Sequence, residues 1–360
     1  MSSPVLFEVT NHVGLVTLNA EKSLNSLTLE MIDVLNGQLE AWAKDDDVAL
    51  VVFAGAGERA FCAGADIRAL YDSVLDCSYG PNPHAEAFFT REYQMDLLIH
   101  RYPKPTVAWG DGVVMGGGLG ILGACSHRVG TERSRVALPE ITIGLFPDAG
   151  ASYFFSRMPT HLAKFIGLTG CQLTTADAID LGLMDYLVPS ERRELLFQTL
   201  MDRDWSVNTP ECLAELFSDL SDSPQAQGEL LRRGDQIEQL FVSDDLVEIR
   251  ERFEQMIEND DWLRTQYANF TSGSPTTAHI VMEQVSRLSN KSIGEFYQME
   301  LNIAVQCTRH PDFAEGVRAL LVDKDRNPQW RYPTLDAVPR EWVEEHFADP
   351  FPLGNPLADQ

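Results

Sequence analysis

The segment Val113–Gly120, with the sequence VVMGGGLG, decides the fold because it closes a strand and opens a helix within a few residues. Successive glycines let the main chain turn sharply and approach a ligand closely. The segment Phe61–Arg68, FCAGADIR, has the same form. Backbone N–H groups at the start of a helix can stabilise a developing oxyanion, so two such turns predict a two-donor anion hole.

Two carboxylates follow the second glycine turn, Glu140 in LPE and Asp148 in FPDAG. Taken singly, Glu140 is explained as a solvated loop carboxylate, and Asp148 as the N-cap of a helix over residues 151–157. Together with an anion hole, the two acids suit acyl-thioester chemistry, which needs charge stabilisation on the carbonyl oxygen and a route for protons.

Over nearly its whole length the sequence resembles the enoyl-CoA hydratase/isomerase (crotonase) superfamily. The matching pieces are FCAG at 61–64, FFTREY at 88–93, MGGG at 115–118, PE at 139–140, IGLFPD at 143–148 and FAEGVRALLVDKD at 313–325. The last piece lies outside the ordinary crotonase core and points to a thioester hydrolase branch. The resemblance implies an α/β fold, a crotonase-like spiral of ββα units with an additional helical C-terminal region.

Residue by residue, the resemblance also implies a site. The N–H groups of Ala65 and Gly117 would form the oxyanion hole, and Glu140 and Asp148 would be catalytic. Glu92 would contact the acyl end of the substrate, together with Gly117, Glu140 and Asp148. The residues implied to bind the coenzyme A part of the substrate are Ala63, Asp66 and Ile67.

The reaction implied by the resemblance is hydrolysis of 3-hydroxyisobutyryl-CoA to 3-hydroxyisobutyrate and CoA, a step of valine degradation. Glu140 would either attack the thioester to give an anhydride or activate water, and Asp148 would bind the substrate hydroxyl or handle protons. The sequence leaves both alternatives open. Coenzyme A is part of the substrate, so no separate cofactor and no metal are expected.

Three other functions compete with thioester hydrolysis. A 2-enoyl-CoA hydratase or isomerase on the same fold is the main alternative, but the resembled hydratases carry a second glutamate where this chain has Gly120. The run from Gly118 to Gly123 matches G-x-G-x-x-G, yet it starts with two further glycines and its candidate acid follows Pro139, unlike a dinucleotide-binding fingerprint. A non-catalytic acyl-CoA-binding protein would not need both acids.

Strand-like runs at 5–9, 13–18, 50–53 and 107–109 alternate with helical spacing. One such helix has Met31, Leu35, Leu39 and Trp42 on one face and is introduced by Ser26 and Thr28. This alternation predicts crossover units in a mainly parallel sheet. Residues 76–84 have the composition of a mobile loop, and later segments, at 229–241, 246–257 and 292–306, show helical spacing. We expect an acyl-CoA-binding catalytic core at 1–200 and a mainly helical C-terminal region at 201–360 that completes the site.

The net charge of −26 argues against nucleic acid and anionic membranes as partners, because both need a positive field. The six cysteines include no C-x-x-C pair, so neither a zinc site nor a disulfide framework is expected. With no apolar run long enough to span a membrane and no targeting pattern at the N-terminus, a cytoplasmic protein is expected. Crotonases are often trimers or hexamers, so a homo-oligomer is one alternative. The other alternative is that the extra C-terminal helices cover the surface that crotonase trimers use.

Overall fold

The computed structural model describes residues 3–205 and 209–358, so Met1 and Ser2, on which part of the N-terminal prediction rests, lie outside it. The chain forms two compact units, each made of three segments. Unit one comprises Met1–Ala65, Gln94–Val136 and Leu173–Leu231, and unit two comprises Asp66–Tyr93, Ala137–Gln172 and Arg232–Gln360. This division differs from a single boundary near residue 200, because segments distant in sequence share each unit.

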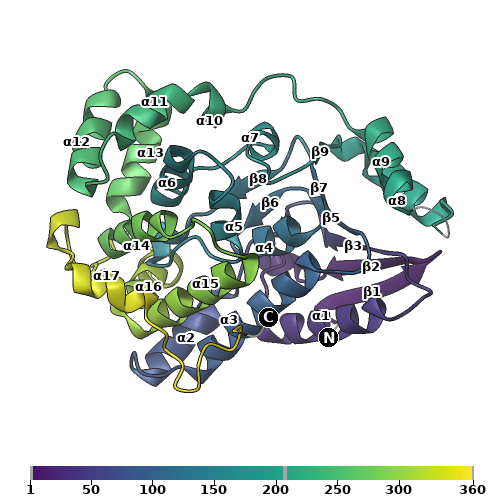
Figure 1. Cartoon of the computed structure of the whole chain (residues 1–360), viewed down its shortest axis with the longest axis horizontal. Helices are drawn as coiled ribbons and strands as arrows, with labels where there is room; N and C mark the ends of the chain where they lie inside the picture. The colour runs from purple at the N-terminus through teal and green to yellow at the C-terminus, as the bar shows by residue number, and fades with distance from the viewer. Residues whose placement is uncertain (1–2, 206–208, 359–360) are drawn as a thin grey trace. The chain divides into compact units, whose positions relative to one another are not determined.

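Unit one is built on a six-stranded sheet in the order β1-β2-β3-β5-β7-β9 (Figure 1). Strand β1 runs antiparallel to β2, and the neighbouring pairs from β2 to β9 are parallel. The strands are β1 Val5–Thr10, β2 Val13–Leu18, β3 Leu50–Gly55, β5 Thr106–Gly110, β7 His127–Gly130 and β9 Tyr186–Leu187. The expected mainly parallel sheet is therefore confirmed.

A second, three-stranded sheet takes the strands between these, β4 Ala60–Cys62, β6 Val113–Met115 and β8 Arg135–Ala137. Successive strands from β3 to β9 thus alternate between the two sheets. Helices follow the strand pairs, with α2 Ile67–Cys77 after β4 and α4 Gly117–Ala124 after β6. This repetition is the expected series of ββα units. Each strand of the small sheet ends just before a segment that carries candidate site residues.

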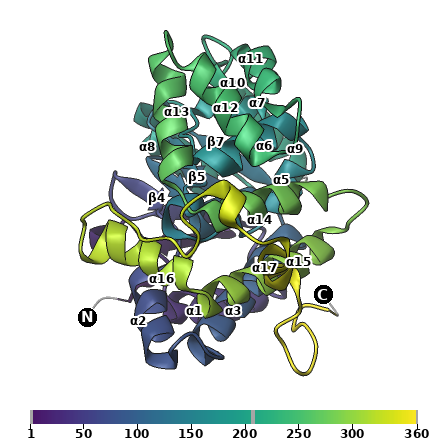
Figure 2. The same cartoon turned by 90° about the vertical axis from the view of Figure 1, so that its left-hand side faces the viewer.

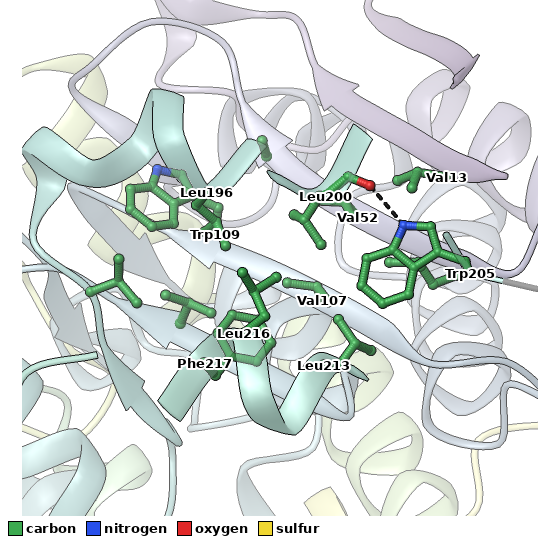
Figure 3. Packing of buried hydrophobic residues seen from close by; sticks show 14 residues of the cluster. Val13, Val52, Val107, Trp109, Leu196, Leu200, Trp205, Leu213, Leu216 and Phe217 are labelled. Carbon is green, nitrogen blue, oxygen red and sulfur yellow. Dashed lines mark hydrogen bonds between the residues drawn. The ribbon is translucent and has the colours of Figure 1, made fainter. Parts of the chain in front are cut away.

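The core of unit one lies between the six-stranded sheet and helices α8 Arg193–Asp202 and α9 Thr209–Leu220 (Figure 3). Valines of the sheet, such as Val52 and Val107, meet Leu200 and Leu213 from these helices. Trp205 is buried in the same cluster, and its indole N–H donates to the Leu200 carbonyl oxygen at 2.7 Å. The continuous apolar runs of these strands explain why they form a covered, parallel sheet.

The other helical elements of unit one are α1 Leu29–Ala43, α7 Thr175–Asp180, and the short η1 Glu21–Ser23 and η3 Ser190–Arg192. Helix α1 begins where the sequence indicates, because the Thr28 side chain accepts a hydrogen bond from the Met31 N–H. Its Trp42 ring covers β2, and a Cβ on Gly14 would lie 2.9 Å from that ring. Helices α3 Pro83–His100 and α10 Glu229–Arg232 contribute residues to both units.

Unit two is helical, and Figure 2 shows its α14, α15, α16 and α17 in green to yellow. No helix in the described ranges is long and apolar enough to cross a membrane. Besides α2, the elements are η2 Glu140–Ile143, α5 Ala151–Phe155, α6 Thr160–Thr169, α11 Gly234–Glu238, η4 Gln239–Phe241, α12 Leu246–Met256, α13 Asp261–Ser272, α14 Pro275–Ser286, α15 Ile293–Arg309, α16 Pro311–Val317, the π-helix η5 Arg318–Val322, η6 Leu335–Ala337 and α17 Arg340–Phe347.

Some local predictions are wrong. The loop expected at 76–84 is a short turn between α2 and α3, and it is pinned by the buried Asn82, whose side chain donates to Ser73 Oγ and accepts from the Ala85 N–H. The helix expected over 229–241 is three short pieces, α10, α11 and η4, and Arg233 separates the first two.

Candidate active site

The two glycine turns lie against each other in unit one. Gly64 has φ = +98°, and a Cβ added there would lie 3.1 Å from the Met115 carbonyl oxygen and 3.6 Å from the Gly117 nitrogen. A Cβ on Gly118 would lie only 2.3 Å from the Cys62 carbonyl oxygen. The turns therefore pack backbone to backbone, which only glycine allows at these positions.

This packing brings the two predicted N–H donors of unit one together. Gly117 is the first residue of α4, after Gly116 with φ = +47°, so its N–H has no acceptor within the helix. Ala65 follows Gly64, whose carbonyl oxygen accepts from the Leu27 N–H at 2.8 Å. Within the described ranges, neither the Ala65 nor the Gly117 N–H donates a hydrogen bond. Both donors are thus available to a ligand oxygen.

Glu140 lies in unit two as the first residue of η2, three residues after β8 ends. Its side chain is buried, and its Oε2 has no hydrogen-bond partner among the described residues. Burial raises the pKa of Glu140 well above its usual range, and the charge of Asp148 raises it further. Glu140 is therefore not the solvated loop carboxylate of the simpler explanation.

Asp148 is also buried in unit two, and its Oδ2 accepts a hydrogen bond from the Tyr93 hydroxyl at 2.5 Å. Burial raises its pKa to about 6, against the lowering effect of that hydrogen bond. The simpler explanation of Asp148, as the N-cap of the next helix, is wrong. Helix α5 has Gly150 at its N-cap position with no side-chain cap, so the Asp148 carboxylate remains in the buried cluster.

Two further buried groups accompany these acids. Tyr93 is fully buried, and burial, followed by the charges of Asp148, Glu300 and Glu92, raises its pKa. Glu92, predicted as a substrate contact, is 1% exposed. Unit two therefore concentrates carboxylates in a site of low polarity, where like charges cannot all ionise near neutral pH. Strongly shifted pKa values of this kind are typical of catalytic groups.

Glu300 on α15 is a member of the cluster that the sequence analysis missed. It is fully buried, and burial raises its pKa to about 8, opposed by hydrogen bonds from the Gly150 and Ser152 N–H groups. A charged residue between Tyr297 and Ala304 on the buried face of a helix was the available signal. Tyr93 lay within a matched motif, but its hydroxyl donor could not be assigned from sequence.

The remaining predicted residues surround the start of α2. Asp66 is the N-cap of this helix, and its carboxylate accepts from the Ala69 N–H at 3.2 Å. Ile67 is the first helical residue, and Ala63 precedes the Gly64 turn. Their assignment to coenzyme A stays a prediction. The run from Gly118 to Gly123 lies wholly inside α4, so it is not a phosphate-binding loop.

A sequence model of the enoyl-CoA hydratase/isomerase family matches residues 13–347. The chain is similar to the 3-hydroxyisobutyryl-CoA hydrolase, mitochondrial, of Danio rerio, with 35% identity over 96% of this chain and 90% of the relative. The corresponding Homo sapiens protein is 34% identical over 95% of this chain and 88% of its own length. The resemblance inferred from the motifs is confirmed, whereas the relatives' names do not support the cytoplasmic location.

Two solved structures share the fold along the whole chain. A carnitinyl-CoA dehydratase from Mycobacterium thermoresistibile superposes with a TM-score of 0.90 and 31% identity, covering 100% of both chains. An enoyl-CoA hydratase from Rhodobacter sphaeroides gives a TM-score of 0.87 and 31% identity, covering 98% of this chain and 99% of the other. The predicted crotonase-like fold, with its extra helical C-terminal region, is confirmed.

Proposed function

The chain belongs to the enoyl-CoA hydratase/isomerase family, and we propose that within it this protein is a thioesterase that hydrolyses 3-hydroxyisobutyryl-CoA to 3-hydroxyisobutyrate and CoA. The observation that carries the proposal is the pair of buried acids, Glu140 and Asp148, whose charges interact, in a chain whose full length matches hydrolases of that name. The same relatives support an enzyme rather than a binding protein.

In the proposed mechanism the Ala65 and Gly117 N–H groups hold the thioester oxygen as negative charge develops on it. Their approach within unit one supports this role, because preorganised donors stabilise an oxyanion without rearrangement. Loss of one such donor typically costs about 10²–10³ in turnover. We propose that these donors and the acids of unit two act on the same thioester. We also propose that the C-terminal region completes the site.

Glu140 provides the attacking function in either of two modes. As a nucleophile, its carboxylate bonds to the acyl carbon, the C–S bond breaks, the CoA thiolate takes a proton, and water then hydrolyses the anhydride. As a general base, Glu140 takes a proton from the water that attacks the acyl carbon, the C–S bond then breaks, and the CoA thiolate takes that proton back from Glu140. The raised pKa of Glu140 makes its carboxylate a stronger base than that of an exposed glutamate. Label in Glu140 after a single turnover in ¹⁸O-labelled water would identify the nucleophilic mode, because it requires water to attack the Glu140 carbon of an anhydride.

Asp148 and Glu92 would bind the substrate hydroxyl or carry protons at the acyl end. A buried polar site that pairs with a hydroxyl rejects analogues that lack it. Neighbouring substrates such as 3-hydroxypropionyl-CoA differ by one methyl group, and a hydrophobic pocket distinguishes them by only about 1–3 kcal/mol. We also propose that the reaction is a step of valine degradation. The proposed partners are a small-molecule acyl-CoA and further copies of the chain. We propose no cofactor beyond the CoA of the substrate.

The test measures free-thiol release from 3-hydroxyisobutyryl-CoA beside hydration of crotonyl-CoA. The variants are Glu140→Gln and, as a matched control, Glu251→Gln at an exposed position of unit two. We expect the parent and the control to release thiol and Glu140→Gln to lose that activity. Near-parental hydrolysis by Glu140→Gln would disprove the mechanism, and hydration without thiol release would identify a hydratase.

A further inference from the structure

Glu300 is a buried carboxylate to which the proposed mechanism gives no role. It lies on α15 with no exposed surface, beside Tyr297 and Leu301, which are also buried. Burial of an ionisable side chain is costly unless hydrogen bonds compensate it. The contacts of its two oxygens therefore indicate what it does.

Both oxygens accept backbone hydrogen bonds from the turn that follows Asp148. Glu300 Oε2 accepts from the Gly150 N–H at 2.8 Å, and Oε1 accepts from the Ser152 N–H at 2.7 Å. The turn needs such support, because Ala149 has φ = +51° and Gly150 has φ = +88°. A left-handed alanine is strained, and strained residues persist where the surroundings hold them.

The residues on either side of Asp148 are held as well. Gln284 on α14 donates from one amide nitrogen to the Pro147 carbonyl oxygen at 2.8 Å and to Ser152 Oγ at 2.9 Å. Tyr93 holds the Asp148 carboxylate itself. Glu300 supplies the contact on the C-terminal side. Because its oxygens are engaged by the backbone, the geometry favours support of the turn over contact with a substrate.

We propose that Glu300 is a positioning residue, whose carboxylate grips the Gly150 and Ser152 N–H groups and so fixes the Asp148 carboxylate against the Tyr93 hydroxyl. This inference rests on the proposed hydrolase function. A misplacement of about 1 Å near a reacting centre costs on the order of 10² in rate. Glu300 thereby acts on the reaction through Asp148 alone.

A double-mutant cycle tests this coupling. We would measure kcat and KM for thiol release with the parent, Glu300→Gln, Asp148→Asn and the double variant, below the melting temperature of each. Glu300→Gln is expected to lower kcat by about 10- to 100-fold, with a smaller change in KM. In the Asp148→Asn background the same change is expected to cost less than about 3-fold, because coupled residues are not additive.

The matched control is Glu295→Gln, on the same helix but exposed, and bonded among the described residues only to Ser292 of its own capping box. It should leave kcat unchanged. Glu300→Asp keeps the carboxyl group but shortens the side chain by one methylene, so its kcat should stay low if the placement of the group, rather than its presence, matters. Equal loss from Glu300→Gln in both backgrounds, or no loss at all, overturns the inference. Recovery of parental kcat by Glu300→Asp also overturns it.

A second readout does not depend on the reaction. In protein labelled with ¹³C at aspartate carboxyl carbons, the Asp148 signal is assigned by its absence from Asp148→Asn. Glu300→Gln is expected to shift the titration midpoint of that signal, whereas Glu295→Gln is expected to leave it in place. A parent that releases no thiol refutes the hydrolase proposal. An unmoved Asp148 midpoint refutes the positioning role whether or not thiol is released.

Discussion

Replacement of Asp148 by Asn should make the protein more stable while it removes activity. The carboxylate is buried, and burial raises its pKa from the usual 3.8 to about 6. A raised carboxyl pKa means that the folded state holds the proton more tightly than the unfolded state does. Ionisation of Asp148 therefore destabilises the folded state, and the neutral amide of Asn, which has the same shape, carries no such penalty. The Asn oxygen can still accept the Tyr93 hydrogen bond.

The size of this effect follows from the pKa. Each unit is worth about 1.4 kcal/mol, so a rise from 3.8 to about 6 corresponds to about 3 kcal/mol at pH 8. The stability that protonation of Asp148 provides is complete below pH 3.8 and is lost as the pH rises through about 6. The advantage of Asp148→Asn over the parent should therefore be largest at pH 8. At pH 5.5 it should still be about 2 kcal/mol, because unfolded aspartate is already ionised there.

The assay is urea unfolding of the parent and Asp148→Asn at both pH values, followed by tryptophan fluorescence, with thiol release measured on the same samples. The exposed Asp336→Asn serves as the control for loss of one negative charge and should stay within about 0.5 kcal/mol of the parent. An Asp148→Asn protein no more stable than the parent at pH 8 would refute the claim that this carboxylate is a buried cost. Full activity would remove it from the mechanism.

Two further predictions concern neighbouring groups. Tyr93→Phe removes a hydrogen bond that lowers the pKa of Asp148. The limb of the kcat/KM–pH profile that reports Asp148 should therefore move up by about one pH unit. An unmoved limb would mean that Asp148 does not set it. Gly118→Ala places a Cβ 2.3 Å from the Cys62 carbonyl oxygen, so chemical unfolding should show a loss of about 1–3 kcal/mol, with slower thiol release. The control Gly37→Ala meets nothing within 4 Å on α1 and should gain about 0.5–1 kcal/mol, and equal behaviour of the two would contradict the close packing of the turns.

The sequence predicts best what local chemistry determines. Glycines in the two turns are needed where backbones approach closely, so Gly64 and Gly118 could be identified without coordinates. The role of Thr28 as the N-cap of α1 could also be predicted, because a capping hydroxyl before an apolar stripe is a local signal. Alternation of strands and helices predicted crossover units, but only the coordinates show that successive strands belong to two sheets.

The sequence predicts less well what depends on distant partners. Taken singly, Asp148 is explained as a helix cap, because Asp is common at that position. Its carboxylate instead accepts a hydrogen bond from Tyr93, which is far away in sequence. The turn at 78–82 has the composition of a loop, but the buried Asn82 anchors it. Glu300 was missed for the same reason, since the N–H groups that donate to it, at Gly150 and Ser152, lie some 150 positions earlier.

The names of the similar proteins divide between hydrolases and hydratases at nearly equal identity, so overall similarity does not choose the chemistry. The choice rests on which acids are present. A hydratase of the resembled type uses a second glutamate at the position of Gly120, which here lies buried inside α4 with its N–H donating to the Gly116 carbonyl oxygen. A glycine offers no group for acid–base work. The acids that remain, Glu140 and Asp148, are buried and have raised pKa values, and Asp148 accepts a hydrogen bond from Tyr93. Buried ionisable groups of this kind lower stability and are concentrated at catalytic sites, which favours the proposed hydrolase over a hydratase.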